Sequence, residues 1–126
     1  MKLNFVRTYE LRMAVPWESA DIEVTGLDWQ PALFRQRMAA NVVDVGSTGC
    51  IALAKWDFSG NQPHFRAFLV DTVTRKIHQS ALISGPPKDI YILSPTQVRV
   101  TLWENADGKD RTVDVDVTEP ASPEFY

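Results

Sequence analysis

The sequence of 126 residues contains one cysteine, Cys50, and two histidines. A lone cysteine cannot form a disulfide within the chain or supply the clustered thiolates of a zinc site. Its position in the apolar run "CIALA" is typical of a buried, unreactive side chain. Because the acidic residues are scattered, we expect no metal site, and no motif predicts a bound cofactor.

Positive charge is also scarce, with 13 Lys and Arg against 16 Asp and Glu and a net charge of −3. A nucleic-acid-binding protein needs a basic surface, so that class is disfavoured. No apolar stretch approaches the roughly 20 residues of a membrane span. Arg7, Glu10 and Arg12 interrupt the start of the chain, where a signal peptide would need an apolar core. We expect a cytoplasmic protein that binds neither nucleic acid nor membranes.

The remaining composition is that of a globular domain, with 44% hydrophobic and 23% charged residues. No internal repeat or interdomain linker divides the chain. We therefore expect one domain over residues 1–118. Residues 119–126 contain two prolines and no periodicity, which predicts a flexible tail.

Two runs near the C-terminus, 97–104 and 111–117, alternate apolar and polar residues with a period of two. This alternation is typical of strands with one buried face, and the intervening "NADGKD" predicts a tight turn. If Glu104 faces Arg111, the valines of the two strands pair with apolar residues. On the other face, Arg99 then meets Asp116 and Thr101 meets Asp114.

Further strands are predicted at 49–58 and 89–93, since both runs are apolar or β-branched and bounded by turn residues. The N-terminal residues 3–15 predict a long strand, bent at Arg7, with 21–25 pairing back onto it.

The stretch 64–85 fits either an amphipathic helix or a hairpin, and its β-branched residues favour the hairpin. In that hairpin Asp71 faces Lys76, and Arg75 occupies a turn position that would prefer glycine. His64 and His78 would lie about 16 Å apart along the strands, too far to share a site.

The segment 28–43 is the best helix candidate, because Phe34, Met38 and Val42 recur every four residues. We therefore predict a mainly β fold, an antiparallel meander forming a curved sheet or small β-sandwich, with one short helix near residues 30–41.

Catalytic motifs are lacking in this sequence, and we expect a protein that is not an enzyme. "GSTG" at 46–49 lacks the lysine of a phosphate-binding loop and the frame of a nucleophile elbow, so it is interpreted as a turn. Asp114 and Asp116 share a strand face but are better explained as a solvated surface than as paired catalytic acids.

Four tryptophans are the most informative excess in the composition. Trp103 falls on the polar side of its predicted strand, beside Arg99. An exposed aromatic next to an arginine is typical of protein-recognition hot spots. We therefore predict a partner-binding surface formed by Trp103, Arg99, Asp114 and Asp116.

The leading hypothesis is a non-catalytic domain that binds another protein, with a basic toxin domain as one such partner. In general character the chain is similar to bacterial immunity proteins, which occlude a toxin. Two alternatives stay open: a small-molecule or carbohydrate-binding module that uses tryptophan platforms, and a structural component of a phage or secretion assembly.

Overall fold

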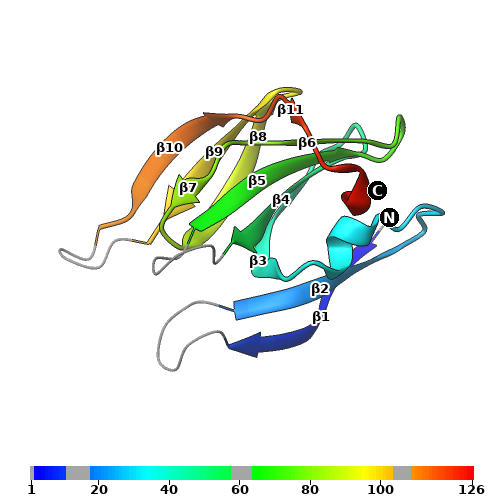
Figure 1. The fold of residues 1–126 in the computed structure, drawn as a ribbon, viewed down its shortest axis with the longest axis horizontal. Helices are drawn as coiled ribbons and strands as arrows, with labels where there is room; N and C mark the ends of the chain where they lie inside the picture. Colours follow the sequence, from blue (N-terminus) through cyan, green and yellow to red (C-terminus); the bar gives the residue numbers. More distant parts are fainter. Residues whose placement is uncertain (1, 11–17, 58–63, 104–108) are drawn as a thin grey trace.

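The computed structural model describes residues 2–10, 18–57, 64–103 and 109–126, which form eleven strands and two short 3-10 turns. The main sheet has the order β1 (Lys2–Glu10), β2 (Glu18–Thr25), β3 (Met38–Val45), β4 (Cys50–Asp57), β5 (His64–Asp71), β6 (Lys76–Gln79) and β11 (Glu119–Pro120), with β7 (Ile83–Ser84) paired to β5. The small sheet has the order β10 (Arg111–Asp116), β9 (Gln97–Leu102) and β8 (Pro87–Ser94). The prediction of a mainly β, antiparallel meander is confirmed (Figure 1).

The two sheets pack on one another through a common apolar layer. Residues of β4 and β5 meet residues of β8 and β9 there, and the layer includes Ala52, Ala54, Trp56, Phe65, Ala67, Leu69, Ile90, Val98, Val100 and Leu102. The small sheet supplies alternate residues to this layer, as expected for a sheet with one solvated face.

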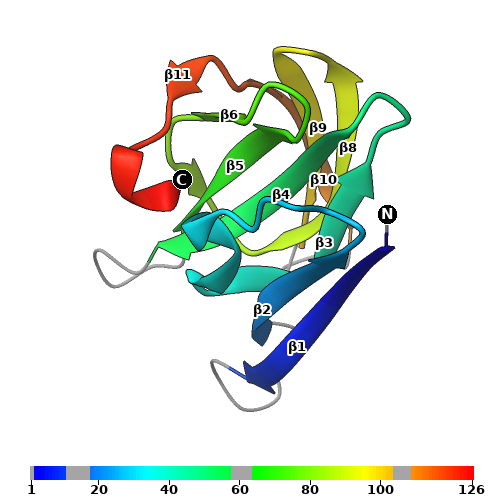
Figure 2. The same cartoon turned by 90° about the vertical axis from the view of Figure 1, so that its right-hand side faces the viewer.

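The opposite face of the central strands β4 and β5 is buried as well. It packs against side chains of β2 and against the two 3-10 turns, η1 (Ala32–Arg35) and η2 (Pro123–Phe125). Ile51, Leu53 and Phe68 belong to this second core. Strand β4 is thus buried on both faces, which explains why "IALA" is apolar without alternation. Figure 2 shows β1 and β2 running along the lower side of the molecule, away from the small sheet.

The predicted helix near residues 30–41 is wrong. One 3-10 turn covers Ala32–Arg35, and β3 begins at Met38. Arg37 has a φ of 57°, and Asn41 has a φ of 63° beside an irregularity in the pairing of β3 with β4. This bulge moves Met38 and Val42 into different cores, so their four-residue spacing imitates a helical face.

The C-terminal hairpin is present, but its register differs from the prediction by two residues. Arg99 pairs with Asp114 rather than Asp116, and Val100 pairs with Val113. A shift of two residues leaves every side chain on the same face, so the alternating pattern alone cannot distinguish the two registers. The predicted turn at Asp107-Gly108 lies outside the described residues.

The hairpin of β5 and β6 has the predicted pairing near its turn, with Asp71 opposite Lys76 and Leu69 opposite His78. Farther from the turn, Phe65 pairs with Ile83 of β7 rather than with Leu82 as predicted. Arg75 has a φ of 58°, the left-handed conformation expected of a glycine. Asp71 stabilises this turn, since its Oδ1 accepts hydrogen bonds from the backbone N–H groups of Val73 and Thr74 at 2.9 and 3.1 Å.

The N-terminal strand pairs with β2 as expected, and the register shifts between Val6 and Tyr9, while positions 11–15 of the predicted strand lie outside the described residues. Arg7, at this shift, has a φ of 51°, and its Nε donates a hydrogen bond of 2.8 Å to Asp21. The predicted bend at Arg7 is therefore a β-bulge.

Residues 119–126, expected to be a flexible tail, pack along the main sheet. Pro120 pairs with His78 in β6, and the Tyr126 hydroxyl hydrogen-bonds both the N–H and the carbonyl of Ile77, at 3.1 and 3.3 Å. The ring of Phe125 meets that of Phe68 edge-on, with centroids 5.6 Å apart. These contacts place η2 beside η1 (Figure 1).

Candidate functional site

The solvent-facing side of the small sheet, here called the outer face, holds most of the residues predicted to bind a partner. Its central row crosses three strands, from Tyr91 through Arg99 to Asp114. The rows on either side are Asp89, Thr101 and Thr112, and Ser94, Gln97 and Asp116. Three aspartates against one arginine give this face an excess of two negative charges.

Arg99 and Asp114 form the strongest polar contact of the outer face. The Arg99 Nε donates to Asp114 Oδ1 at 2.8 Å, and a second guanidinium nitrogen donates to Oδ2 at 3.2 Å. These hydrogen bonds and the charge of Arg99 lower the pKa of Asp114, while the same carboxylate raises the pKa of Arg99. The two hydrogen bonds fix the guanidinium plane, and both side chains stay exposed to solvent. Asp116 lies one row away, with its Oδ1 3.5 Å from the Gln97 side-chain nitrogen.

Two apolar residues of the outer face did not enter the predicted site. Tyr91 is 52% exposed and Leu93 is 40% exposed, while Ile90 between the sheets is buried. The signal for them was present in "DIYIL", because a strand that buries Ile90 directs Tyr91 to the opposite face. Tyr91 and Leu93 make the outer face partly apolar as well as acidic.

Trp103 does not lie with Arg99 on the outer face. Strand β9 ends at Leu102, and the Trp103 N–H donates to the carbonyl of Pro86 at 3.1 Å. The Nζ of Lys88 lies 4.4 Å from the centroid of the Trp103 ring, a cation–π contact that occupies one side of the indole. The half-buried ring lines a hollow of about 240 Å³ together with Glu18, Ala40, Asn41, Val42, Pro87 and Lys88.

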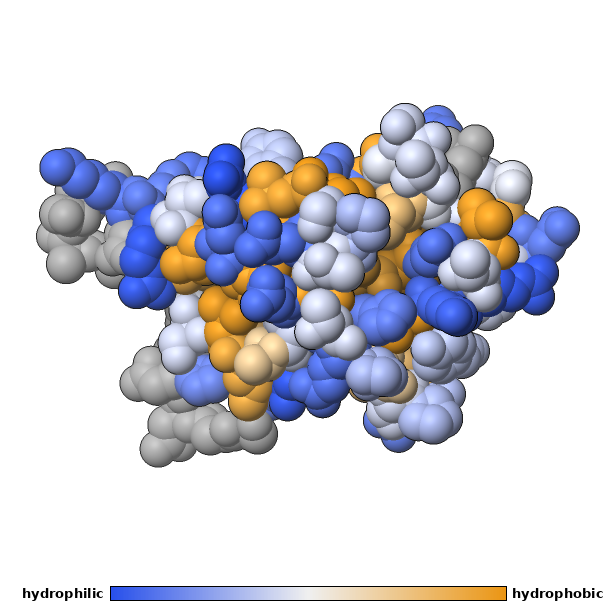
Figure 3. Space-filling view, turned by 90° about the horizontal axis from the view of Figure 1, so that it is seen from above, coloured by the Kyte–Doolittle hydropathy of each residue, from blue (hydrophilic) through white to orange (hydrophobic). Residues whose placement is uncertain are grey.

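The apolar surface of the molecule is divided into separate areas. In Figure 3, orange side chains reach the surface in bands between hydrophilic ones. The larger exposed apolar residues are likewise scattered among the end of β3, the β5–β6 turn, the loop after β6, the outer face and the C-terminus. The outer face is distinguished by combining two of them with an ordered ion pair.

The histidines and the cysteine are not brought together. His64 pairs with Ser84 and Asp57, while His78 pairs with Leu69 and Pro120. Cys50 is half-buried, and burial together with the nearby carboxylates Asp71 and Asp44 raises the pKa of its thiol, which disfavours the nucleophilic thiolate.

The described part of the chain contains neither a group of three or more His, Cys, Asp or Glu side chains that could hold a metal ion nor a helix long and apolar enough to cross a membrane. A scan against protein-family models, a search of curated proteins and a search of solved structures each returned no match.

Proposed function

We propose that this protein is a non-catalytic domain that binds a basic partner protein through the outer face of its small sheet. The single observation that carries this proposal is the exposure of Tyr91 and Leu93, 52% and 40%, beside the Arg99–Asp114 pair. Aromatic and arginine residues contribute disproportionately to protein interfaces. The excess of acidic residues around them complements a basic surface.

The size of the face limits the strength of the interaction. Three strands about 4.8 Å apart and about 20 Å long present an area on the order of 300 Å², against about 800 Å² per partner in a standard interface. Binding through this face alone is therefore expected to be weak and transient. Tight inhibition of a toxin would require additional contacts elsewhere on the surface.

The test compares three forms of the protein as affinity baits in extracts of the cells that encode it, with chemical crosslinking before washing so that a weak complex is retained. The variants are Tyr91→Ala, which truncates the exposed aromatic residue at the β8 end of the central row, and Val73→Ala, which truncates a residue 76% exposed in the β5–β6 turn. We expect one basic protein to be retained by the wild type and by Val73→Ala. Its recovery with Tyr91→Ala should fall about tenfold, the effect of losing one interface anchor.

The proposal would be rejected if no basic protein were retained, or if Tyr91→Ala retained it as well as the wild type does. For a retained protein, titration calorimetry with purified components should give the same order of affinities. Raising the ionic strength should weaken binding, because complementary charges contribute to it.

The narrower prediction of an immunity protein stays a prediction, and a secreted toxin encoded directly upstream would favour it. The carbohydrate-binding alternative also stays a prediction, although Lys88 already covers one side of Trp103. The assembly-component alternative predicts oligomers that grow with concentration through an open sheet edge.

A further inference from the structure

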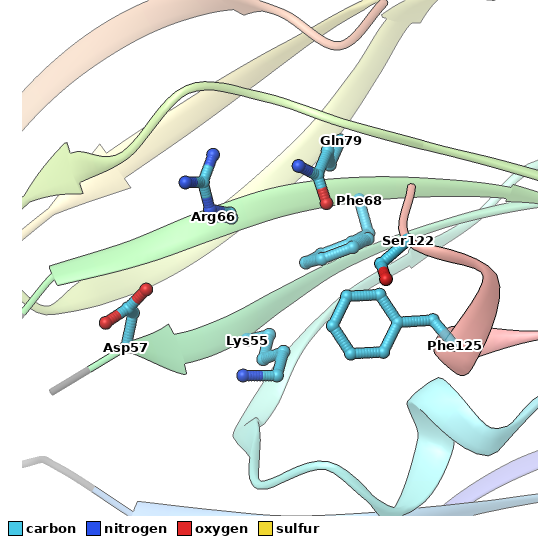
Figure 4. Close-up of a pocket in the computed structure, with 7 residues that line it drawn as sticks. All are labelled: Lys55, Asp57, Arg66, Phe68, Gln79, Ser122 and Phe125. Atoms are coloured by element: carbon cyan, nitrogen blue, oxygen red, sulfur yellow. The ribbon is translucent and has the colours of Figure 1, made fainter. Parts of the chain in front are cut away.

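A second feature of the surface is a positively charged hollow on the face of the main sheet that points away from the small sheet. It is lined by Lys55 and Asp57 from β4, Arg66 and Phe68 from β5, Gln79 from β6, and Ser122 and Phe125 from the C-terminal segment. Figure 4 shows the ring of Phe125 next to Lys55, with Arg66 and Gln79 across from them. The hollow does not include any residue of the outer face.

Lys55 and Arg66 are direct cross-strand partners in the pairing of β4 with β5. Like charges in this position destabilise a sheet unless a counter-charge lies between them. Each cation is oriented by a neutral backbone acceptor, since Arg66 donates to the carbonyl of Ser80 at 2.9 Å and Lys55 donates to that of Trp56 at 3.3 Å. These carbonyls position the two side chains without neutralising their charge.

The lining as a whole carries an excess of one positive charge, from Lys55 and Arg66 against Asp57, in a chain whose net charge is −3. Arginine and lysine are the usual ligands of carboxylate and phosphate groups, and arginine can donate two parallel hydrogen bonds to either. This local charge therefore favours an anion.

The shape of the hollow restricts the size and type of that anion. Its volume is about 180 Å³, the space of about six water molecules. The ring of Phe125 forms an aromatic wall, backed by the fully buried ring of Phe68 at a centroid distance of 5.6 Å, and the Lys55 Nζ lies 5.8 Å from the centroid of Phe125. A compact ligand with a flat apolar part would contact this wall while its charged group meets the cations.

We propose that this hollow binds a small organic anion, a carboxylate or phosphate monoester attached to a compact flat group. Lys55 and Arg66 hold the charged group, and Phe125 packs against the apolar part. Because Ser122 and Phe125 belong to the C-terminal segment, a bound ligand joins this segment to the main sheet. Ligand binding should therefore stabilise the folded protein as well as fill the site.

The test is titration calorimetry and thermal unfolding of the full chain with phenyl phosphate, benzoate and inorganic phosphate at constant ionic strength. We expect saturable binding of phenyl phosphate or benzoate, with the same probe raising the unfolding temperature. The two aromatic probes show whether the site prefers phosphate or carboxylate. Inorganic phosphate, which lacks a ring, should bind more weakly than phenyl phosphate.

Two lysine variants show where the anion binds. Lys55→Met should weaken binding about tenfold, since it removes one charge-assisted hydrogen bond. Lys76→Gln, at an exposed position on β6 outside the hollow, should bind as the wild type does. Arg66→Gln should also lose affinity for the anion. Because it also removes the hydrogen bond to the Ser80 carbonyl, the result for Lys55→Met decides the test if this variant fails to fold.

The proposal would be overturned if none of the three probes bound saturably. It would also be overturned if Lys55→Met and Lys76→Gln lost the same affinity for the bound probe. Tyr91→Ala, which alters the outer face, should leave the affinity for these anions unchanged. The anion site and the proposed protein-binding face can therefore fail independently.

Discussion

The centre of the main sheet and the small sheet are both antiparallel, yet they use their side chains differently. Strands β4 and β5 are buried on both faces, and all four residues from Ile51 to Ala54 are inaccessible to solvent. Strand β9 buries one face, strand β10 half-buries Val113 and Val115 on the same side, and both strands expose polar residues on the other face. The difference indicates that the main sheet supplies most of the stability, while the small sheet offers a surface that can change without unfolding the domain.

The largest expected effect comes from truncating an aromatic residue in each region. Phe65→Ala, at a side chain that is fully buried between the sheets, should lower the free energy of unfolding by about 3–5 kcal/mol. Tyr91→Ala on the outer face should lower it by about 1 kcal/mol or less. Urea denaturation followed by tryptophan fluorescence measures both values. Similar losses in the two variants would contradict the proposed division between the sheets.

A smaller effect is expected at the edge of the main sheet, where the Tyr126 hydroxyl hydrogen-bonds the backbone of Ile77. Tyr126→Phe removes both hydrogen bonds but keeps the ring beside Trp29. The free energy of unfolding should fall by about 1 kcal/mol. Tyr91→Phe, at an exposed hydroxyl, is the control and should change it less. No loss in Tyr126→Phe would mean that the C-terminal segment adds little to the stability of the main sheet.

The turns of the two sheets should respond in opposite ways to glycine. Arg75 in the β5–β6 turn has a φ of 58°, so Arg75→Gly removes a backbone strain of about 1 kcal/mol and should leave stability unchanged or raise it by up to that amount. Thr96, between β8 and β9, lies outside the left-handed region. Thr96→Gly should therefore destabilise the protein by about 0.5–1 kcal/mol. Thermal unfolding of both variants tests this contrast, which a loss of stability in Arg75→Gly would refute.

The smallest expected effect is a difference in how added salt changes the pKa values of Asp71 and Asp114. Hydrogen bonds from the backbone at Thr74 and Val73 lower the pKa of Asp71, whereas Arg99 lowers the pKa of Asp114. Because salt screens an exposed ion pair, about 0.5 M NaCl should raise the pKa of Asp114 toward its ordinary value and move that of Asp71 less. A carbon-detected NMR titration of the carboxyl groups measures both.

The same two carboxylates predict the sign of the pH dependence. Each has a pKa below its usual value in the folded state, so each stabilises the fold above the ordinary Asp pKa of about 3.9. That stabilisation should be lost as the pH falls through the folded-state pKa. Asp71→Asn should flatten the fall in unfolding temperature below about pH 4, and an unchanged slope would contradict the role assigned to Asp71.

The alternating patterns predicted most of the strands, because a strand with one buried face must repeat every two residues. The same rule could have identified Tyr91, since its neighbour Ile90 is buried. The rule failed at residues 38–42, where a bulge at Asn41 changes which core each side chain enters. Local spacing cannot reveal a bulge that is stabilised by pairing with a distant strand.

The placement of the candidate sites depended on contacts between distant parts of the chain. Trp103 does not lie on the predicted surface, because strand β9 ends at Leu102, the residue before it, and Lys88 packs on the Trp103 ring. Lys55 and Arg66 carry no distinctive motif, and they line a hollow only because residues 122–125 fold back beside them.

The sequence by itself determined the mainly β fold and which side chains lie on each face of the C-terminal hairpin. A strand with one buried and one solvent-exposed face must alternate apolar and polar residues with a period of two. Only the tertiary structure decided the register of that hairpin, since a shift of two residues preserves the pattern and the partner of Arg99 is still an aspartate. It also decided that the C-terminal residues dock on the main sheet. Their hydrogen bonds to Ile77 and the contact of Phe125 with Phe68 join segments about fifty residues apart, a distance over which no local pattern extends.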